Sequence, residues 1–137
     1  MPDAKPAGLF ALVHAAGNAE SRVDSKLSVI GLSLPKLAAL HQLALAGDSL
    51  PLGQLAERLS CVKSNVTQLV DRLEADGLVE RVPDAADRRS IRASLTEAGR
   101  ARQKAGSTEV DRVSAGFSSE ISPTDGATLE RLLTALK

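Results

Sequence analysis

The fold of this chain is decided by residues 51–96, which read PLGQLAERLSCVKSNVTQLVDRLEADGLVERVPDAADRRSIRASLT. In two segments of this stretch, apolar residues recur at i, i+3, i+4 and i+7, so they share one face of a helix. The first set is Leu52, Leu55, Ala56 and Leu59, and the second is Val66, Leu69, Val70 and Leu73. Two short amphipathic helices joined by residues 60–63 must pack at a steep angle, which predicts a helix-turn-helix.

The second of these helices is predicted to have a polar outer face. At about 100° per residue, Ser64, Gln68 and Arg72 lie opposite the apolar stripe, with Asn65 and Thr67 on its flanks. Asn and Gln bond an adenine edge in the DNA major groove through two hydrogen bonds, and Ser or Thr reach bases or phosphates. A solvated surface helix carries the same residue types, so this face alone leaves both interpretations open.

Residues 78–95 predict a two-stranded ribbon with a charged tip, in which residues 78–83 and 90–95 alternate as strands do. Gly77 suits a left-handed cap at the end of the preceding helix. Asp87 is placed to hold the loop between the strands by pairing with a neighbouring arginine. Arg88, Arg89 and Arg92 give a cationic tip suited to phosphates or to a narrow minor groove.

The segment LAERLSCVKSNVTQLVDRLEADGLVERVPDAADRRSIRASLTEAG resembles the winged helix-turn-helix of MarR-type transcriptional regulators, above all in its DRRS wing followed by SLTEAG. The resemblance implies a mainly α fold with a small β wing, flanked by N- and C-terminal dimerisation helices. Residues 1–137 would form a single domain, with residues 33–96 as the DNA-binding region and residues 8–30 and 97–137 as the dimerisation helices.

The resemblance also implies a function and a site. The protein would bind a pseudo-palindromic operator as a homodimer, with the second helix in the major groove and the wing near the minor groove. It would act as a repressor of transcription that a small-molecule effector releases. The predicted DNA-binding residues are Lys63, Ser64, Asn65, Thr67, Gln68, Arg72, Arg88, Arg89 and Arg92.

Two positions depart from the family pattern. Val62 stands where such proteins often have a capping Ser or Thr, and valine offers no oxygen to the first helical amides, so the cap is expected at Ser60 or Ser64. Gln68 stands where arginine is frequent on the exposed face, and glutamine favours an adenine over a guanine. The operator sequence therefore does not carry over from the family.

The flanking segments are predicted to be helical. A helix is expected from residue 8 to a break near residue 30, and Ser33 caps the next one. Thr96 caps a long helix with a weak point at Gly106, and Ser122 starts the last helix. Residues 49–51 are expected to pair with the wing as a third strand.

Apolar stripes lie at both chain ends, where little domain is left to cover them. Contact with a second copy of the chain would bury them, and so would a self-contained helical core. By resemblance, the terminal helices form the dimer interface. The predicted interface residues are Phe10, Val13, Phe117, Leu129, Leu132, Leu133 and Leu136.

Composition fits one ordinary globular domain with a sizeable core, because 43% of the 137 residues are hydrophobic. Lys and Arg number 17, as do Asp and Glu, so the formal net charge is zero. A nucleic-acid-binding domain is usually basic. The neutral balance therefore favours an alternative function, a winged-helix protein-interaction module without DNA binding.

The sequence predicts no membrane span, secretion signal or internal disulfide, since it has one cysteine and no run of roughly 20 apolar residues. A cytoplasmic protein is expected. His14 and His41 lie on different predicted helices, and no glycine-rich phosphate loop or ligand cluster accompanies them. No catalytic residue, metal site or cofactor is predicted, and the chain is not expected to be an enzyme.

Cys61 supports a further alternative, a thiol-based redox-responsive regulator. The thiol lies in the turn before the second helix, where the helix N-terminus and Lys63 would stabilise a thiolate. A buried cysteine that packs as a small apolar residue explains the same position.

Overall fold

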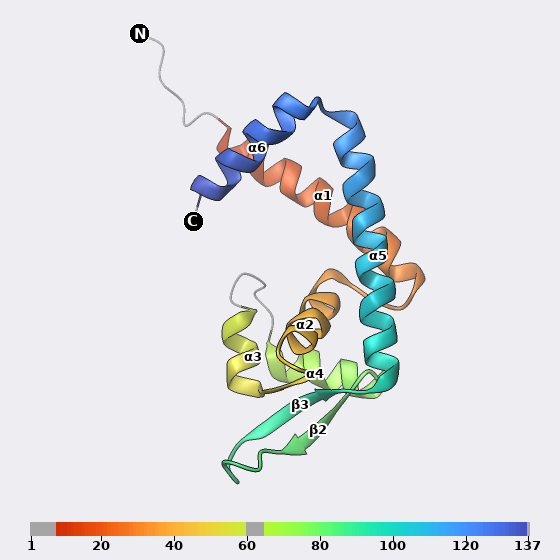
Figure 1. Ribbon diagram of the computed structural model, residues 1–137, viewed down its shortest axis with the longest axis vertical. Coiled ribbons are helices and arrows are strands. Elements are labelled where there is room, and N and C mark those ends of the chain that lie inside the picture. Colours follow the sequence, from red (N-terminus) through yellow and green to blue (C-terminus); the bar gives the residue numbers. More distant parts are fainter. Residues whose placement is uncertain (1–7, 60–64, 137) are drawn as a thin grey trace.

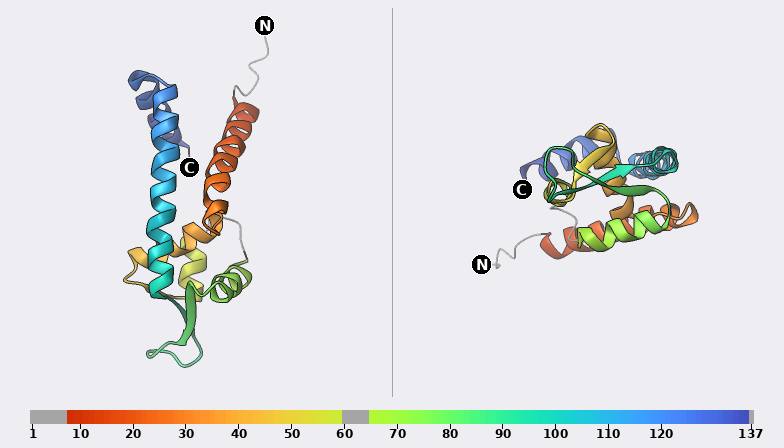
Figure 2. Two further views of the ribbon diagram at one scale, coloured as in Figure 1. Left: turned by 90° about the vertical axis from the view of Figure 1, so that its right-hand side faces the viewer. Right: turned by 90° about the horizontal axis from the view of Figure 1, so that it is seen from below.

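In the computed structural model of this chain, residues 8–59 and 65–136 are described (Figure 1). The elements, in chain order, are α1 (Leu9–Val29), α2 (Leu34–Leu45), β1 (Ser49–Pro51), α3 (Leu52–Arg58), α4 (Val66–Ala75), β2 (Val79–Pro83), β3 (Ile91–Leu95), α5 (Glu97–Glu120) and α6 (Pro123–Ala135). Helices α2 to α4 and the strands gather at one end of the molecule, and α1, α5 and α6 extend away from it (Figures 1 and 2). The predicted fold class is therefore confirmed.

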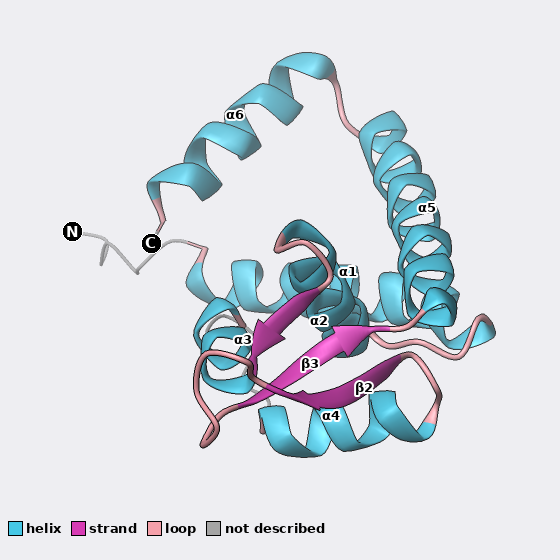
Figure 3. Ribbon diagram, turned by 60° about the horizontal axis from the view of Figure 1, so that its bottom comes forward, coloured by secondary structure: helices cyan, strands magenta, loops and turns pink. Residues whose placement is uncertain are grey.

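The three strands form one antiparallel sheet in the order β1-β3-β2 (Figure 3). Ala93 at the centre of β3 is paired with Leu50 on one side and with Arg81 on the other. The expected third strand at residues 49–51 is thus present, and β2 is left as an edge strand of the wing.

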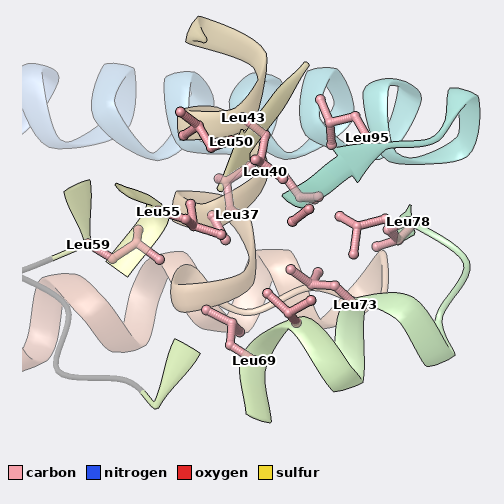
Figure 4. Close-up of a cluster of buried hydrophobic side chains, with 14 of the residues drawn as sticks. Leu37, Leu40, Leu43, Leu50, Leu55, Leu59, Leu69, Leu73, Leu78 and Leu95 are labelled. Atoms are coloured by element: carbon pink, nitrogen blue, oxygen red, sulfur yellow. The ribbon is translucent and has the colours of Figure 1, made fainter. Parts of the chain in front are cut away.

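The hydrophobic core lies between the sheet and helices α2, α3 and α4 (Figure 4). Leu40, Leu43, Leu55, Leu73 and Leu78 are fully buried there. Burying a leucine side chain stabilises a fold by about 1.5–3 kcal/mol, so these side chains fix the angle at which α3 and α4 meet. The packing presents the opposite face of α4 to solvent.

Side-chain caps define the start of three helices as predicted. The Ser33 hydroxyl accepts from the Lys36 amide at 3.3 Å, Thr96 from Gly99 at 3.0 Å, and Ser122 from the Asp125 amide at 3.1 Å. At the other end of α4, Gly77 has a φ of +75°, and the Leu78 amide returns to the Leu73 carbonyl at 2.9 Å. This left-handed turn aims the chain from α4 into the wing.

Helix α5 continues through Gly106, and the weak point expected there is absent from the structure. Gly106 is buried, and a Cβ at this position would lie 2.7 Å from Cδ1 of Leu37. The glycine therefore lets α5 approach α2 closely instead of breaking the helix.

The terminal helices bury little of their apolar surface within the chain. Leu27 is the single buried residue of α1, and α6 has none within its described length. A self-contained core made by the terminal helices, one of the two alternatives, is thus not what the structure shows. An exposed ion pair of 2.7 Å between Arg22 and Glu120 links α1 to the end of α5, and its hydrogen bond lowers the pKa of Glu120.

Among the described residues, no single helix is long and apolar enough to cross a membrane. Helices α1 and α2 reach that length and composition only as a pair, with a bend of 78° between them.

Candidate nucleic-acid interface

The exposed face of α4 carries the polar side chains that the helical spacing predicted there. Thr67, Gln68 and Arg72 are all exposed, whereas Leu69 and Val70 are buried in the core. The polar residues are exposed and the apolar ones are buried because the apolar face of α4 packs against the core. Polar groups near the start of α4 are therefore free to meet a ligand.

Asn65 caps α4. Its Oδ1 accepts from the amides of Thr67 at 3.0 Å and Gln68 at 3.4 Å. The cap was expected at Ser60 or Ser64, and both lie outside the described residues; among the described ones, the Asn65 oxygen satisfies two of the first helical amides at once. Asn65 was also predicted to bind DNA; its oxygen is occupied in this structure, and its NH₂ group is left to donate.

The wing tip is shaped by two aspartates that bond to the backbone. Asp84 Oδ1 accepts from the Ala86 amide and Asp87 Oδ1 from the Arg89 amide, both at 3.0 Å. Asp87 therefore supports the loop as expected, although its partner in the structure is an amide and not an arginine side chain. Arg88 and Arg89 project from this loop, and neither forms an ion pair with any residue that the structure describes.

Arg92 lies apart from the other two wing arginines, on the central strand β3. Its Nε donates to Ser49 Oγ at 2.8 Å and its Nη2 to the Ser49 carbonyl at 3.3 Å. Asp84 lies 3.6 Å from its Nη1. These contacts join β1 to the base of the tip, so Arg92 serves the shape of the wing in this structure.

Arg81 on β2 is a residue of this region that the sequence did not single out. Its guanidinium contacts Asp71 at 2.6 Å and Glu74 at 2.8 Å, both on α4. The hydrogen bond to Asp71 is the main cause that raises the pKa of Arg81 above its ordinary value. No local signal could have found this cluster, because its members come from a helix and a strand.

The start of α2 is the other neighbour of α4. Lys36 Nζ bonds to Asp76 Oδ2 at 2.9 Å, which ties α2 to the end of α4. Between the two helices lies a polar hollow of about 230 Å³, lined by Ser33, Pro35, Lys36, Asn65, Gln68, Leu69 and Arg72. The predicted side chains of α4 are thus brought together beside two further polar groups of α2.

Three predicted residues, Cys61, Lys63 and Ser64, lie outside the described residues. In the part of the chain that is described, no group of three or more His, Cys, Asp or Glu side chains could hold a metal ion. Within that part, His14 and His41 belong to no such group.

A helix-turn-helix whose second helix runs into a three-stranded wing defines a winged helix-turn-helix. The model of the MarR family matches residues 30–90. The uncharacterized HTH-type transcriptional regulator YsmB of Bacillus subtilis is 33% identical over 88 residues, which cover 64% of this chain and 60% of that protein. The matched region, from α2 to the wing, is thus a winged helix-turn-helix of the MarR family.

Solved structures share the whole arrangement of helices. A probable transcriptional regulator from Pseudomonas aeruginosa superposes with a TM-score of 0.83 at 27% identity, covering 97% of this chain and 98% of that one. A mutant of MarR from E. coli, complexed with operator DNA, gives 0.83 at 24% identity and covers 95% and 94% of the two chains. The chain spans 42% to 60% of the length of the curated relatives that it matches.

Proposed function

We propose that this protein is a transcriptional regulator that binds double-stranded DNA in a sequence-specific manner. One observation carries the proposal: the polar face of α4 and the wing-tip arginines, which have no ion-pair partner among the described residues, are both exposed. Gln68 and Thr67 would meet base edges in the major groove, and Arg88 and Arg89 would meet phosphates or the minor groove. The structure of E. coli MarR with operator DNA supports this assignment by its fold.

The proposed regulator is a homodimer. Large apolar side chains are exposed on α1, α5 and α6, among them Phe10, Val13, Phe117, Leu132 and Leu136. Large apolar side chains that are exposed together on the terminal helices indicate an interaction site, and a twofold dimer would bury them on both copies. Residues 33–96 would then be the DNA-binding region and the terminal helices the interface, within a single domain.

The dimer should select duplexes with two half-sites about 10 to 10.5 base pairs apart. To test this, the protein would be mixed with a random-sequence duplex pool at low salt, and the retained fragments sequenced. Affinity for the selected duplex should fall steeply as salt rises, because arginines displace counterions from phosphates. If no duplex is retained, the protein-interaction alternative replaces this proposal.

Arg89 and Gln68 should make different contributions to the affinity. Arg89→Ala should weaken binding to all duplexes and reduce the slope of log affinity against log salt by about 1. Gln68→Ala should cost about 1–3 kcal/mol at one base position and relax the preference there. Competition binding with single-base variants of the selected duplex separates the two outcomes, and the reverse pattern would contradict these roles.

We also propose repression with release by a small-molecule effector. A cavity of about 330 Å³ lies between α2 and α5, lined by Leu34, Leu37, Ala38, His41, Ser107, Val110 and Asp111. Its size is that of a small-ligand site, and α5 connects it to the proposed dimer interface. Transcription in vitro from a promoter that carries the selected duplex should fall when the protein is added.

A further inference from the structure

Four contacts join Arg81 of the wing to α4. The side chain bonds to Asp71 Oδ1 at 2.6 Å, to Glu74 Oε1 at 2.8 Å and to the carbonyl of Thr67 at 3.2 Å. The backbone amide of Arg81 donates to Glu74 Oε2 at 3.1 Å. Together the contacts span two turns of α4, from its second residue to its ninth.

The position of Arg81 in the sheet explains the backbone contact. Among the described strands, β2 pairs with β3 on one side only, so its other side is an edge of the sheet. Glu74 accepts from an amide of this edge, and its second oxygen holds the guanidinium of the same residue. The edge of the wing is thereby fastened to the flank of α4.

An arginine is needed for this arrangement. The planar guanidinium offers donors in a fixed fork, and here Nη1 and Nη2 each hold a different carboxylate while Nη2 also reaches a carbonyl. A lysine has one nitrogen on a flexible stem and cannot hold three acceptors in these directions. The side chain of Arg81 is 25% exposed, which leaves less of it open to solvent than of the 60% exposed Asp71.

One of the two carboxylates that Arg81 holds, that of Asp71, lies beside the face of α4 that would meet DNA. Asp71 lies three residues after Gln68, on the neighbouring turn of the exposed face. An unpaired carboxylate there would repel phosphates. The guanidinium of Arg81 therefore holds α4 at a fixed rotation against the wing, and it also pairs the carboxylate of Asp71.

We propose that Arg81 is a positioning residue of the DNA interface, which holds α4, the second helix of the helix-turn-helix, against the wing through Asp71, Glu74 and Thr67. The inference rests on the proposed function, because α4 and the wing tip must enter adjacent grooves at a fixed separation. Its consequence is that Arg81 governs selectivity among sequences, while Arg88 and Arg89 govern affinity for DNA in general.

The test compares Arg81→Gln, Arg81→Lys and the control Arg100→Gln with the wild-type protein. Arg100 forms a 2.7 Å ion pair with Asp48, a residue distant in the sequence, and both lie outside the proposed interface. Arg100→Gln therefore removes an ion pair, as Arg81→Gln does, without touching that interface. Dissociation constants would be measured for the duplex that the wild-type protein selects and for a scrambled duplex of equal length. A loss of folded protein would raise both apparent dissociation constants by the same factor, so it cancels in their ratio.

Both Arg81 variants should lose selectivity roughly tenfold, through weaker binding of the selected duplex, while the scrambled duplex is bound as before. Amide hydrogen exchange of the free variants should rise in residues 65–76 and 79–95 together. Arg100→Gln should keep the wild-type ratio. The salt dependence of scrambled-duplex binding should stay unchanged, since Arg81 is expected to touch no phosphate.

Three results would overturn the inference. Wild-type selectivity in Arg81→Lys would show that charge alone suffices. A reduction of the salt slope by about 1 in Arg81→Gln would show a direct phosphate contact. Unchanged hydrogen exchange in both segments would show that the contacts do not couple α4 to the wing. Failure of the proposed function looks different: the wild-type protein then selects no duplex, and the inference falls with it.

Discussion

Replacing Gly99 with alanine should destabilise the protein by about 3 kcal/mol or more, at the upper end of the cost of overpacking. Gly99 lies in the first turn of α5, where a Cβ would overlap the carbonyl oxygen of Leu78 and lie 3.1 Å from Cδ2 of Leu95. The Leu78 carbonyl is backbone and accepts from the Thr96 amide at 3.1 Å, so it cannot move without breaking the joint between α4, the wing and α5.

The gain in helix propensity from alanine, about 1 kcal/mol, does not offset this clash. We expect the midpoint of thermal unfolding to fall by roughly 10 °C for a chain of this size. Gly53→Ala is the matched control, since Gly53 is an exposed helical glycine and a Cβ added there would meet nothing within 4 Å. That variant should be as stable as the wild-type protein or slightly more so. Equal stability of Gly99→Ala and the wild-type protein would contradict the close approach of α5 to Leu78.

The helices and their caps could be predicted because each depends on residues a few positions apart. Ser33, Thr96 and Ser122 accept from amides three residues later, and their hydroxyls precede clear apolar stripes. Asn65 shows the limit of this reasoning. Several capping residues stand close together before α4, and only the backbone geometry decides which oxygen meets the free amides.

The roles of the wing arginines could not be predicted, because all four arginines of residues 81–92 look alike in the sequence. The hydrogen-bond partner of Arg92, Ser49, lies 43 positions away on β1, and the partners of Arg81 lie on α4. Only the folded chain shows that these two are held internally while Arg88 and Arg89 stay unpaired among the described residues. The sequence thus shows where the positive charges are. Whether each arginine is paired within the chain or open to a ligand depends on contacts between distant segments.

The double substitution Leu132→Asp and Leu136→Asp should abolish the proposed dimer and weaken operator binding by about 100-fold or more. Both leucines lie at the end of the chain in and just after α6, one turn apart, with exposed fractions of 53% and 59%. Because neither is buried in the chain itself, two carboxylates there should cost the folded monomer little. In a twofold interface the same carboxylates would lose their hydration against apolar side chains of the other copy.

Dimerisation converts the second half-site contact into an intramolecular event, so its loss removes the gain in affinity that two linked binding sites provide. Sedimentation should give the mass of one chain at micromolar concentration, and affinity for a duplex with a single half-site should stay unchanged. Leu45→Asp is the matched control, because Leu45 is 65% exposed at the end of α2 and is not one of the proposed interface residues. If the α6 variant sediments as a dimer, or if Leu45→Asp dissociates it equally, the interface does not lie on α6.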